Sequence, residues 1–458
     1  MPVLIWESDM KDLFLIRHAK SSWDDDSLSD HARPLNPRGE EQLPPLARAL
    51  QRYDALAGEV YASHAVRAQQ TLQGIVPEAL MRERIHTDAE LYTFDYQRLL
   101  RWLQNQDDQV QTLAIVGHNP ALLELAAHLV KQAPFELPTA GFIHVRLPIR
   151  HWRKLAKQEG RLEVFLTPRD FSFEAFERKI GKRVAISGKQ PAKDIPARLM
   201  RLTERLAQLE RGVMLGLDDE FLHQYRIALR RSRAIADSVA EVTKSKSLKN
   251  HLSQLKRHAQ ATSSLRDLHV FLQDLPALCR DDAAFRAELE GWTKVRAAKE
   301  QTRLAKRLGS KRYRNSLHSW ENELQSRHFG KLIDKLSNKD IRNCVDRQLR
   351  GFNRKAEALQ SDAPDEDLHQ LRKHLKRLRY LMELDAENWK SALKVLRQRQ
   401  DLYGRFQDLH VQIGLVKDFA AKAPEGVPSG ADSLLDRLER EKLDARQLIL
   451  LADGLKAR

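Results

Sequence analysis

The sequence predicts a multidomain chain, with an N-terminal α/β three-layer domain around a mostly parallel sheet and a C-terminal all-α, duplicated helical bundle. Short apolar runs alternate with helical patterns through the first 150 residues. Beyond residue 194 strand signals cease, and long windows repeat apolar residues every three or four positions. One segment of this helical part recurs 146 positions later. Alternating elements favour a layered α/β domain, whereas a helical period with an internal repeat favours a duplicated bundle.

Four apolar runs are the predicted strands of the first domain, at residues 13–16, 59–62, 112–116 and 143–147. Residues 39–52 are predicted to form a helix after the turn residues Asn36 and Pro37. Strands separated by helices form parallel sheets, and functional groups gather at the carboxyl ends of those strands. The first domain is therefore expected over residues 11–168.

The rest of the chain divides into a linker and two helical repeats. Pro, Gly and Lys become frequent after Thr167, and residues 187–191 are Ser-Gly-Lys-Gln-Pro. This composition predicts a linker over residues 169–194. The helical domain is expected over residues 195–458, with repeats at about 195–330 and 331–458.

Charge is distributed unevenly along the 458 residues, which carry a formal net charge of +15. Residues 1–190 hold 25 Lys and Arg against 25 Asp and Glu, whereas residues 191–458 hold 53 against 38. The whole positive excess lies in the helical part. A field of that sign attracts phosphates, nucleic acid or anionic lipid, so the partner of this part is expected to be anionic.

Cysteine usage and hydropathy indicate the compartment. The chain has two cysteines, Cys279 and Cys344, which excludes a disulfide framework and a cysteine metal cluster. No run approaches the roughly 18 apolar residues of a membrane span. The first ten residues lack the basic flank and apolar stretch of a secretory signal. We therefore expect a cytoplasmic protein without a membrane span.

Arginine and histidine recur where three of the predicted strands end. Arg17 and His18 follow the first strand, Arg67 follows the second, and His118 follows the third. If these strands are parallel neighbours, the four side chains meet at one edge of the sheet. Arginine forks match phosphate oxygens, and a neutral imidazole can attack phosphorus. This set predicts a phosphoryl pocket that requires no metal and no cofactor.

The segments around these residues resemble the signatures of the histidine phosphatase superfamily, in its compact SixA-type branch, over about residues 11–150. The matching motifs are Arg17-His18-Ala19, Arg33-Pro34-Leu35 with Gly39, Arg67-Ala68-Gln69-Gln70-Thr71 and Val116-Gly117-His118-Asn119-Pro120. The resemblance implies that His18 is a nucleophile that becomes transiently phosphorylated before water releases phosphate. It implies that three side chains hold the phosphoryl oxygens: Arg17, Arg67 and His118. Arg33 is assigned to substrate binding, chiefly as a brace of the pocket.

The leaving group has no evident proton donor. Larger members of the superfamily take a carboxylate from an insertion between the second arginine and the second histidine, but Arg67 and His118 are only 51 positions apart. Glu90 and Asp95 are the carboxylates near a plausible position, and neither lies in a recognisable motif. General acid catalysis contributes a factor of about 10² to 10⁴, so its absence favours phosphohistidine over ordinary phosphoesters. The alternative is a vestigial pocket that senses phosphate.

The helical repeat carries a stripe of cations. At 100° per residue, four residues of the first copy fall within an arc of about 80° on one helix: His223, Arg226, Arg230 and Arg233. The first copy holds His223, Arg226, Arg230, Arg231 and Arg233, and the second holds His369, Arg372, Lys373, Lys376, Arg377 and Arg379. Two such stripes facing each other would line a positive groove, whereas a single copy would more often be a solvated basic face. Leu371, Leu375 and Leu378 occupy another sector, which suits packing.

A second repeated segment follows each stripe. The stripe and this segment together resemble the conserved histidine α-helical domain, CHAD. Arg266-Asp267-Leu268-His269-Val270 recurs as Gln407-Asp408-Leu409-His410-Val411, 141 positions later. The resemblance spans about residues 195–458 and implies that the stripes, with Arg266, bind inorganic polyphosphate. Lys376 and Gln407 stand where the first copy has Arg230 and Arg266, so the two walls are expected to grip unequally. Asp267 and Asp408 either orient a basic side chain or cap a helix.

These features predict a metal-independent phosphohistidine phosphatase joined to a polyphosphate-binding domain, in the cytoplasm and associated with polyphosphate granules. Its partners would be polyphosphate and a phosphohistidine-bearing protein. The first alternative is a non-catalytic polyphosphate scaffold. The second is a nucleic-acid-binding protein, which the lack of aromatics between the cations disfavours. Hydrolysis of the polymer itself ranks low. A metal at His223 or His369 is improbable, because the surrounding arginines and lysines would repel a dication.

Overall fold

The computed structural model describes residues 10–76, 84–180, 194–422, 430–452 and 454–455. Contacts divide the chain into two compact units, residues 1–182 with 215–218 and residues 183–214 with 219–458. The first unit holds a six-stranded sheet with helices, and the second is built from helices in its described residues. The predicted fold class, an α/β domain followed by an all-α domain, is confirmed.

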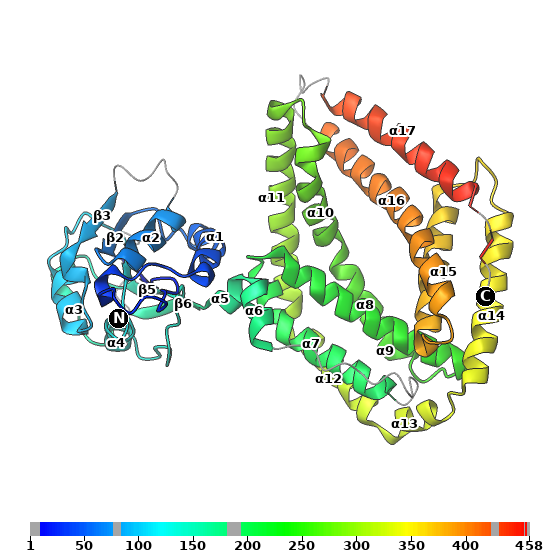
Figure 1. Cartoon of the computed structure of the whole chain (residues 1–458), viewed down its shortest axis with the longest axis horizontal. Helices are drawn as coiled ribbons and strands as arrows, with labels where there is room; N and C mark the ends of the chain where they lie inside the picture. Colours follow the sequence, from blue (N-terminus) through cyan, green and yellow to red (C-terminus); the bar gives the residue numbers. More distant parts are fainter. Residues whose placement is uncertain (1–9, 77–83, 181–193, 423–429, 453, 456–458) are drawn as a thin grey trace, which may run out of the picture. The chain divides into compact units, whose positions relative to one another are not determined.

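The first unit is built on one mixed sheet (Figure 1). Its strands are β1 (Lys11–Arg17), β2 (Glu59–Ser63), β3 (Ile85–Asp88), β4 (Thr112–Gly117), β5 (Phe142–Leu147) and β6 (Arg161–Leu166). The strand order is β3-β2-β4-β1-β5-β6. The pairs β3-β2, β2-β4 and β4-β1 are parallel, whereas β1-β5 and β5-β6 are antiparallel. The carboxyl ends of β1, β2 and β4 therefore meet at one edge, as predicted.

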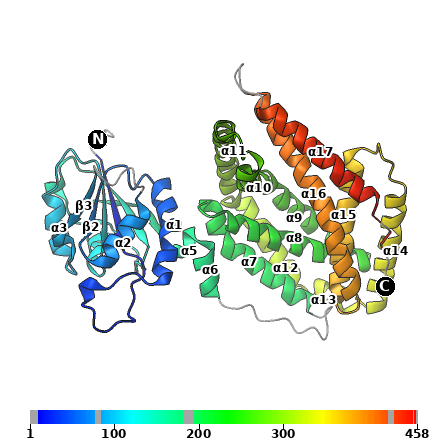
Figure 2. The ribbon, with the colours of Figure 1, turned by 45° about the horizontal axis from the view of Figure 1, so that its top comes forward.

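Helices cover both faces of the sheet and complete three layers (Figure 2). On one face, α1 (Pro37–Arg52) and α2 (Val66–Ile75) pack with Phe14 and Ile16 of β1. On the other face, α3 (Tyr96–Gln104) and α4 (Ala121–Leu129) pack with Leu13 and Leu15. Because β1 is buried on both sides, its sequence is a continuous apolar run rather than an alternating one.

Two strands of the first unit are absent from the predicted set, and two helices lie where a linker was predicted. β3 and β6 lie at the sheet edges and are mostly only partly buried. α5 (Pro168–Phe171) and α6 (Phe173–Ile180) occupy the start of the predicted linker. Thr167 and Asp170 form a capping box at α5, and Phe171 packs against Phe142 at 6.4 Å between ring centres. The α/β unit therefore continues beyond residue 168; residues 181–193 of the predicted linker lie outside the described residues.

The second unit is a bundle whose repeated segments lie on two contacting helices. Its helices are α7 (Ile195–Leu215), α8 (Asp219–Val242), α9 (Lys249–Ala261), α10 (Ser263–Leu278), α11 (Ala283–Leu308), α12 (Lys311–Gln325), α13 (Arg327–Asp334), α14 (Asn338–Glu357), α15 (Asp365–Met382), α16 (Lys390–Ala420) and α17 (Gly430–Leu450). α8 carries the first cationic stripe, α15 carries the second, and the two helices pack together. Leu371, Leu375 and Leu378 of α15 are buried, as predicted. No described helix combines the length and apolarity of a membrane span.

Candidate functional site

The loop after β1 is held against its neighbours by main-chain contacts. The N–H of His18 donates to the carbonyl of Gly117, at the end of β4, at 3.2 Å. The N–H of Ala19 donates to Thr71 Oγ1 of α2 at 2.9 Å. Thr71 in turn donates to the carbonyl of Arg67 at 2.7 Å. These contacts fix the predicted nucleophile relative to the strand and the helix that supply its partners.

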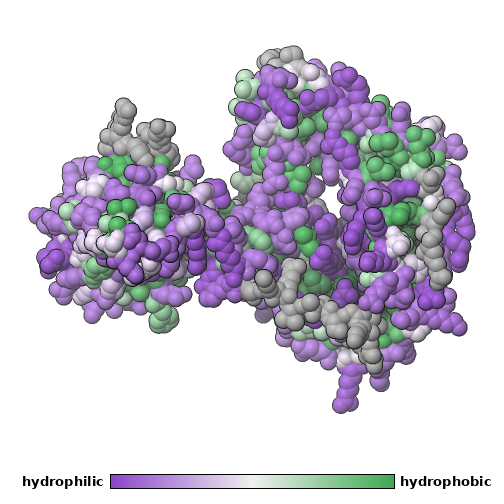
Figure 3. Space-filling view, viewed as in Figure 1, coloured by the Kyte–Doolittle hydropathy of each residue, from purple (hydrophilic) through white to green (hydrophobic). Residues whose placement is uncertain are grey.

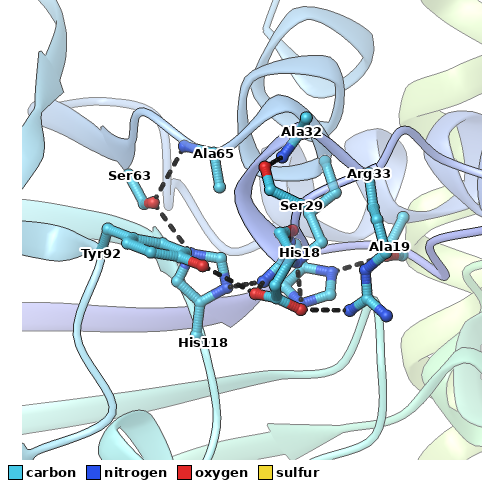
Figure 4. Close-up of polar contacts among 11 residues, drawn as sticks. His18, Ala19, Ser29, Ala32, Arg33, Ser63, Ala65, Tyr92 and His118 are labelled. Atoms are coloured by element: carbon cyan, nitrogen blue, oxygen red, sulfur yellow. Dashed lines mark hydrogen bonds and ion pairs between the residues drawn. The ribbon is translucent and has the colours of Figure 1, made fainter. Parts of the chain in front are cut away.

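The predicted side chains gather at this edge of the sheet. Arg67 Nε donates to His18 Nε2 at 3.2 Å, and Arg67 Nη2 lies 3.4 Å from His118 Nδ1. The two histidine rings are 5.1 Å apart (Figure 4). Arg17 donates to the carbonyl of Leu137 at 2.8 Å, and its buried Nε has no hydrogen-bond partner among the described residues. We call this group, with Arg33, the pocket.

Hydrogen bonds set the tautomers of both histidines. The carbonyl of Ala19 lies 2.7 Å from His18 Nδ1 and can only accept, so Nδ1 carries the proton and Nε2 keeps its lone pair. Arginine can only donate, so His118 Nδ1 accepts from Arg67 and the proton is on Nε2. His118 Nε2 then donates to Ser63 Oγ at 2.8 Å. The unprotonated Nε2 of His18, which accepts from Arg67 Nε, is the atom that can attack phosphorus once that hydrogen bond is released.

Burial keeps both imidazoles neutral. Desolvation lowers the pKa of His18 to about 4; the Ala19 carbonyl opposes this, and the charges of Arg67 and Arg17 add to it. Desolvation also lowers the pKa of His118 to about 2, helped by His18 and Arg67. A buried histidine beside guanidinium groups resists protonation because its charged form is poorly solvated and repelled. At neutral pH the pocket therefore holds uncharged imidazoles among arginines.

An unpredicted carboxylate, Asp30, lies in the pocket. Arg67 Nη2 donates to its Oδ2 at 2.8 Å, Arg33 Nη2 donates to its Oδ1 at 2.5 Å, and the Tyr92 hydroxyl donates to Oδ2 at 2.7 Å. Burial alone would raise the pKa of Asp30, but the hydrogen bonds from Tyr92 and Arg67 and the arginine charges bring it below its usual value. The available signal was its position three residues before the predicted Arg33.

The two carboxylates considered in the sequence lie elsewhere. Asp95 caps α3, where its side chain accepts from the N–H of Gln97 at 2.8 Å. Glu90 lies exposed in the short turn η4 (Ala89–Leu91). Neither contacts the pocket through any hydrogen bond found in the described part of the chain. Asp30 is the acidic group beside the arginines.

Aromatic rings border the pocket. Tyr92 lies edge-on to His118, with ring centres 5.3 Å apart (Figure 4). The ring centre of Phe94 lies 5.9 Å from that of His118. His31 lies 4.2 Å from His64 and 5.1 Å from Tyr92. Phe94 is half exposed. We call His31, His64, Tyr92 and Phe94 the aromatic rim.

The second unit contains a groove with a volume of about 1500 Å³. Cations from α8, α9, α14, α15 and the loop before α9 line it: Arg226, Arg230, Arg233, Lys246, Lys249, Lys256, Lys355, Arg372, Lys373, Lys376 and Arg377. Asp237 is the acidic residue among its lining side chains. Figure 3 shows this unit hollowed on the visible face, with mostly hydrophilic residues around the hollow. The two predicted stripes thus contribute to one positive groove.

Four of the residues predicted to bind polyphosphate do not line the groove: His223, Arg231, Arg266 and Arg379. Arg379 donates to Gln400 at 2.7 Å and lies 3.4 Å from Glu383. His369 lines the groove, and its Nδ1 donates to Gln407 at 2.5 Å. The cationic face of each helix is therefore wider than the groove, and only its central part faces inward.

Two family models match the chain over the parts described above. The histidine phosphatase superfamily (branch 1) matches residues 13–110, and the CHAD domain matches residues 197–417. The chain carries a domain of the histidine phosphatase superfamily and a CHAD domain. Membership of that superfamily indicates phosphatase chemistry in general.

Two curated relatives are similar to about a third of this chain. An uncharacterized chloroplastic protein of Arabidopsis thaliana is 32% identical over 138 residues, which cover 28% of this chain and 63% of that protein. An uncharacterized protein of Mycobacterium tuberculosis is 30% identical over 166 residues, which cover 34% of this chain and 100% of that protein. The chain thus spans less than two thirds of the Arabidopsis relative.

Solved structures are similar to each part. SixA from Agrobacterium tumefaciens is 25% identical, with 34% of this chain and 98% of that chain covered and a TM-score of 0.30. The CHAD domain from the plant Ricinus communis is 22% identical, with 60% of this chain and 98% of that chain covered and a TM-score of 0.48.

Partly buried cations line the CHAD groove. Desolvation lowers the pKa of Arg226 to about 10, and the charge of Arg230 adds to this. Desolvation lowers the pKa of Lys376 to about 7, with Arg372 and Arg230 adding to the shift. Arg226 also donates to Thr262 Oγ1 at 2.6 Å, which holds its guanidinium in place. The groove thus keeps cations close together in a partly desolvated setting.

Asp267 and Asp408 interact electrostatically with these cations. Burial raises the pKa of Asp267, while Arg226 lowers it and Asp408 raises it further. Burial also raises the pKa of Asp408, and Arg372 opposes this shift. Asp408 lies in the middle of α16, so it cannot cap that helix. Each carboxylate is coupled electrostatically to the arginine of its own repeat, Asp267 to Arg226 and Asp408 to Arg372, which agrees with the orienting role.

Proposed function

We propose that the phosphatase domain hydrolyses phosphohistidine on proteins without a metal ion, and that the CHAD domain binds inorganic polyphosphate. The state of His18 carries the first part of the proposal. It is a buried, neutral imidazole whose Nε2 lone pair lies 3.2 Å from Arg67 Nε, among further arginines. A neutral imidazole beside cationic oxyanion donors is the arrangement that nucleophilic attack on phosphorus requires.

The reaction would proceed in two displacements at phosphorus. His18 Nε2 attacks while the bond from phosphorus to the substrate's imidazole nitrogen breaks, and the departing imidazole takes its proton from solvent. Arg17 and Arg67 stabilise the charge spread over the phosphoryl oxygens. Water then attacks the phosphorus atom on His18 and the bond from phosphorus to Nε2 breaks, so that phosphate leaves and the imidazole is restored.

Asp30 and the aromatic rim support this substrate class. The lowered pKa of Asp30 leaves it ionised at neutral pH, so it cannot donate a proton to an alkoxide leaving group. A phosphoester needs such a donor, whereas an imidazole departs more easily. The rings of Tyr92 and Phe94 beside His118 offer apolar faces to a flat heterocycle.

The charge of the groove supports polyphosphate as the ligand of the CHAD domain. Eleven Lys and Arg and one Asp line it. Tyr380 is the one Phe, Tyr or Trp among the lining residues, so the groove offers little stacking surface to nucleic-acid bases. Because both domains share one chain, binding of the polymer would hold the phosphatase at polyphosphate granules in the cytoplasm.

Phosphate release from a phosphohistidine-bearing protein tests the enzyme proposal. The assay compares wild type with His18→Ala in the presence of a chelator, and His86→Ala serves as the control because His86 pairs with Glu59 at 2.6 Å outside the pocket. We expect turnover by wild type and His86→Ala and none by His18→Ala. Equal inactivity of all three toward phosphohistidine and phosphoester donors would replace the enzyme with a polyphosphate scaffold.

Binding of labelled polyphosphate tests the CHAD proposal. Arg226→Ala and Arg372→Ala are each expected to weaken binding about tenfold, because a hydrogen bond to a charged group contributes about 1.5–3 kcal/mol. Arg303→Ala is the control, since Arg303 is exposed on α11 and pairs with Glu300. Competition with duplex DNA at several salt concentrations follows. Tighter binding of DNA than of polyphosphate would make nucleic acid the ligand.

A further inference from the structure

The Asp30 carboxylate uses the donors that the proposed reaction needs. Of the nitrogens of Arg67, Nε donates to His18, Nη1 to the main-chain carbonyl of Asp30, and Nη2 to Asp30 Oδ2 at 2.8 Å. Nη2 also lies 3.4 Å from His118. Every nitrogen of this guanidinium is thus engaged. While the Asp30 carboxylate stays in place, a phosphoryl group cannot take over its bonds from Arg67 Nη2 and Arg33 Nη2.

Polar contacts, rather than packing, hold Asp30 there. It lies on the loop between β1 and α1, in which residues 23–30 are all exposed, and its own side chain is 47% exposed. Its partners are Arg33, Arg67 and Tyr92. Exposed ion pairs are screened and hold a side chain weakly. The carboxylate can therefore leave the arginines without uncovering apolar surface.

A tetrahedral oxyanion would satisfy more of the pocket than a carboxylate does. Among the described residues, Arg17 Nε and Arg33 Nε are buried without a hydrogen-bond partner. A carboxylate offers two oxygens in one plane, whereas a phosphoryl group offers three terminal oxygens around phosphorus. The Asp30 carboxylate thus leaves donors unpaired that a phosphoryl group could use.

We propose that Asp30 is an internal ligand of the phosphoryl site and that substrate binds by displacing it. The proposal rests on the assignment of this pocket as a phosphatase site. It makes Asp30 a residue that sets an affinity threshold, because every incoming group must bind the arginines better than a tethered carboxylate does. A terminal phosphoryl dianion meets that threshold. A phosphodiester or an internal phosphate of polyphosphate carries one charge and fewer free oxygens, and is rejected.

Two tetrahedral oxyanions of similar size test the exchange, tungstate with two charges and perrhenate with one. Calorimetry on the full chain measures their affinities for wild type, Asp30→Asn and Asp30→Ala. Asp26→Asn is the matched control, since Asp26 is an exposed carboxylate of the same loop outside the arginine cluster. We expect both Asp30 variants to bind tungstate about tenfold more tightly and perrhenate by the same factor, with Asp26→Asn unchanged.

Displacement and simple repulsion differ in this assay. If the Asp30 carboxylate leaves, its displacement reduces the binding free energy of tungstate and of perrhenate by the same amount. If the carboxylate stays in place, its repulsion reduces the binding free energy of the dianion about twice as much as that of the monoanion. A tungstate gain well above the perrhenate gain would therefore overturn the proposal, as would unchanged or weaker affinity in both Asp30 variants. Anion binding needs no turnover. A chain without phosphohistidine activity that still shows the equal gain would overturn the proposed function and keep Asp30 as the internal ligand.

Discussion

Lys376 gives the CHAD groove a pH dependence with a calculable size. Its ammonium faces Arg372 and Arg379 on its own helix, Arg230 on α8 and Asp408 on α16. Desolvation and the arginines lower the pKa of Lys376 to about 7 in the empty groove. Bound phosphates favour the charged form and would return this pKa toward the ordinary value of about 10.4. Binding above pH 7 therefore takes up a proton.

The sign and magnitude follow from this linkage. Below pH 7 the lysine is charged in both the free and the bound state, so affinity does not depend on its titration. Above pH 7 the free lysine is neutral, and affinity falls up to about tenfold for each pH unit. Between pH 7 and pH 8.5 the expected loss is at most about thirtyfold.

Fluorescence anisotropy with labelled polyphosphate at fixed ionic strength measures this loss. Lys376→Arg is the matched variant, because a guanidinium stays charged throughout the range and should give a flat profile. Calorimetry in two buffers of different ionisation enthalpy should record uptake of close to one proton at pH 8. Equal wild-type affinity at pH 7 and 8.5, or an unchanged pH dependence in Lys376→Arg, would refute the reasoning.

Two predictions concern stability. Tyr313→Phe removes the hydroxyl that lies 2.5 Å from the Tyr225 hydroxyl and donates to Glu210 at 2.7 Å. The buried Tyr225 and the partly buried Glu210 each lose a partner, so the free energy of unfolding of the helical part should fall by about 1–3 kcal/mol, measured by urea unfolding followed by circular dichroism. The pKa values of His18, about 4, and His118, about 2, lie below the unfolded value of about 6.5. The unfolded state then binds more protons below pH 6.5, so the α/β domain should lose up to about 1.4 kcal/mol per pH unit per histidine as pH falls. Denaturation midpoints at pH 7 and 5 measure this, and equal midpoints would contradict it.

The fold could be predicted where burial leaves a strong pattern. β1, β2, β4 and β5 are buried strands with apolar runs, and their predicted ranges fall within the observed ones. β3 and β6 lie at the edges of the sheet, where partial exposure permits polar residues and removes that signal. α5 is stabilised by a capping box and by the packing of Phe171. The frequent Pro, Gly and Lys after Thr167 predicted a linker instead of this helix.

The pocket shows the same division between local and tertiary information. Arg17, His18, Arg67 and His118 follow strands whose order brings them together, so their meeting could be predicted. Asp30 lies on an exposed loop whose path depends on its contacts with Arg67, Arg33 and Tyr92. No periodicity reports such contacts.

The groove was predictable as a feature but not residue by residue. An arc of about 80° describes which cations share a face of a helix, and α8 and α15 do contribute Arg226 and Arg372 to one groove. The arc does not state which part of that face points at the partner helix. Arg379 and Arg231 lie on the same helices and do not line the groove.

Both sites face one electrostatic problem, because cations gathered to hold phosphate repel one another when phosphate is absent. In the pocket, the carboxylate of Asp30 pairs with Arg67 and Arg33. In the groove, Asp267 and Asp408 sit behind the arginines, and Lys376 reduces the repulsion by losing its proton near pH 7. In the proposals above, the ligand would reverse each device, through displacement in one site and proton uptake in the other. Both sites can therefore stay assembled while empty, at the cost of part of the affinity that bare cations would have for phosphate.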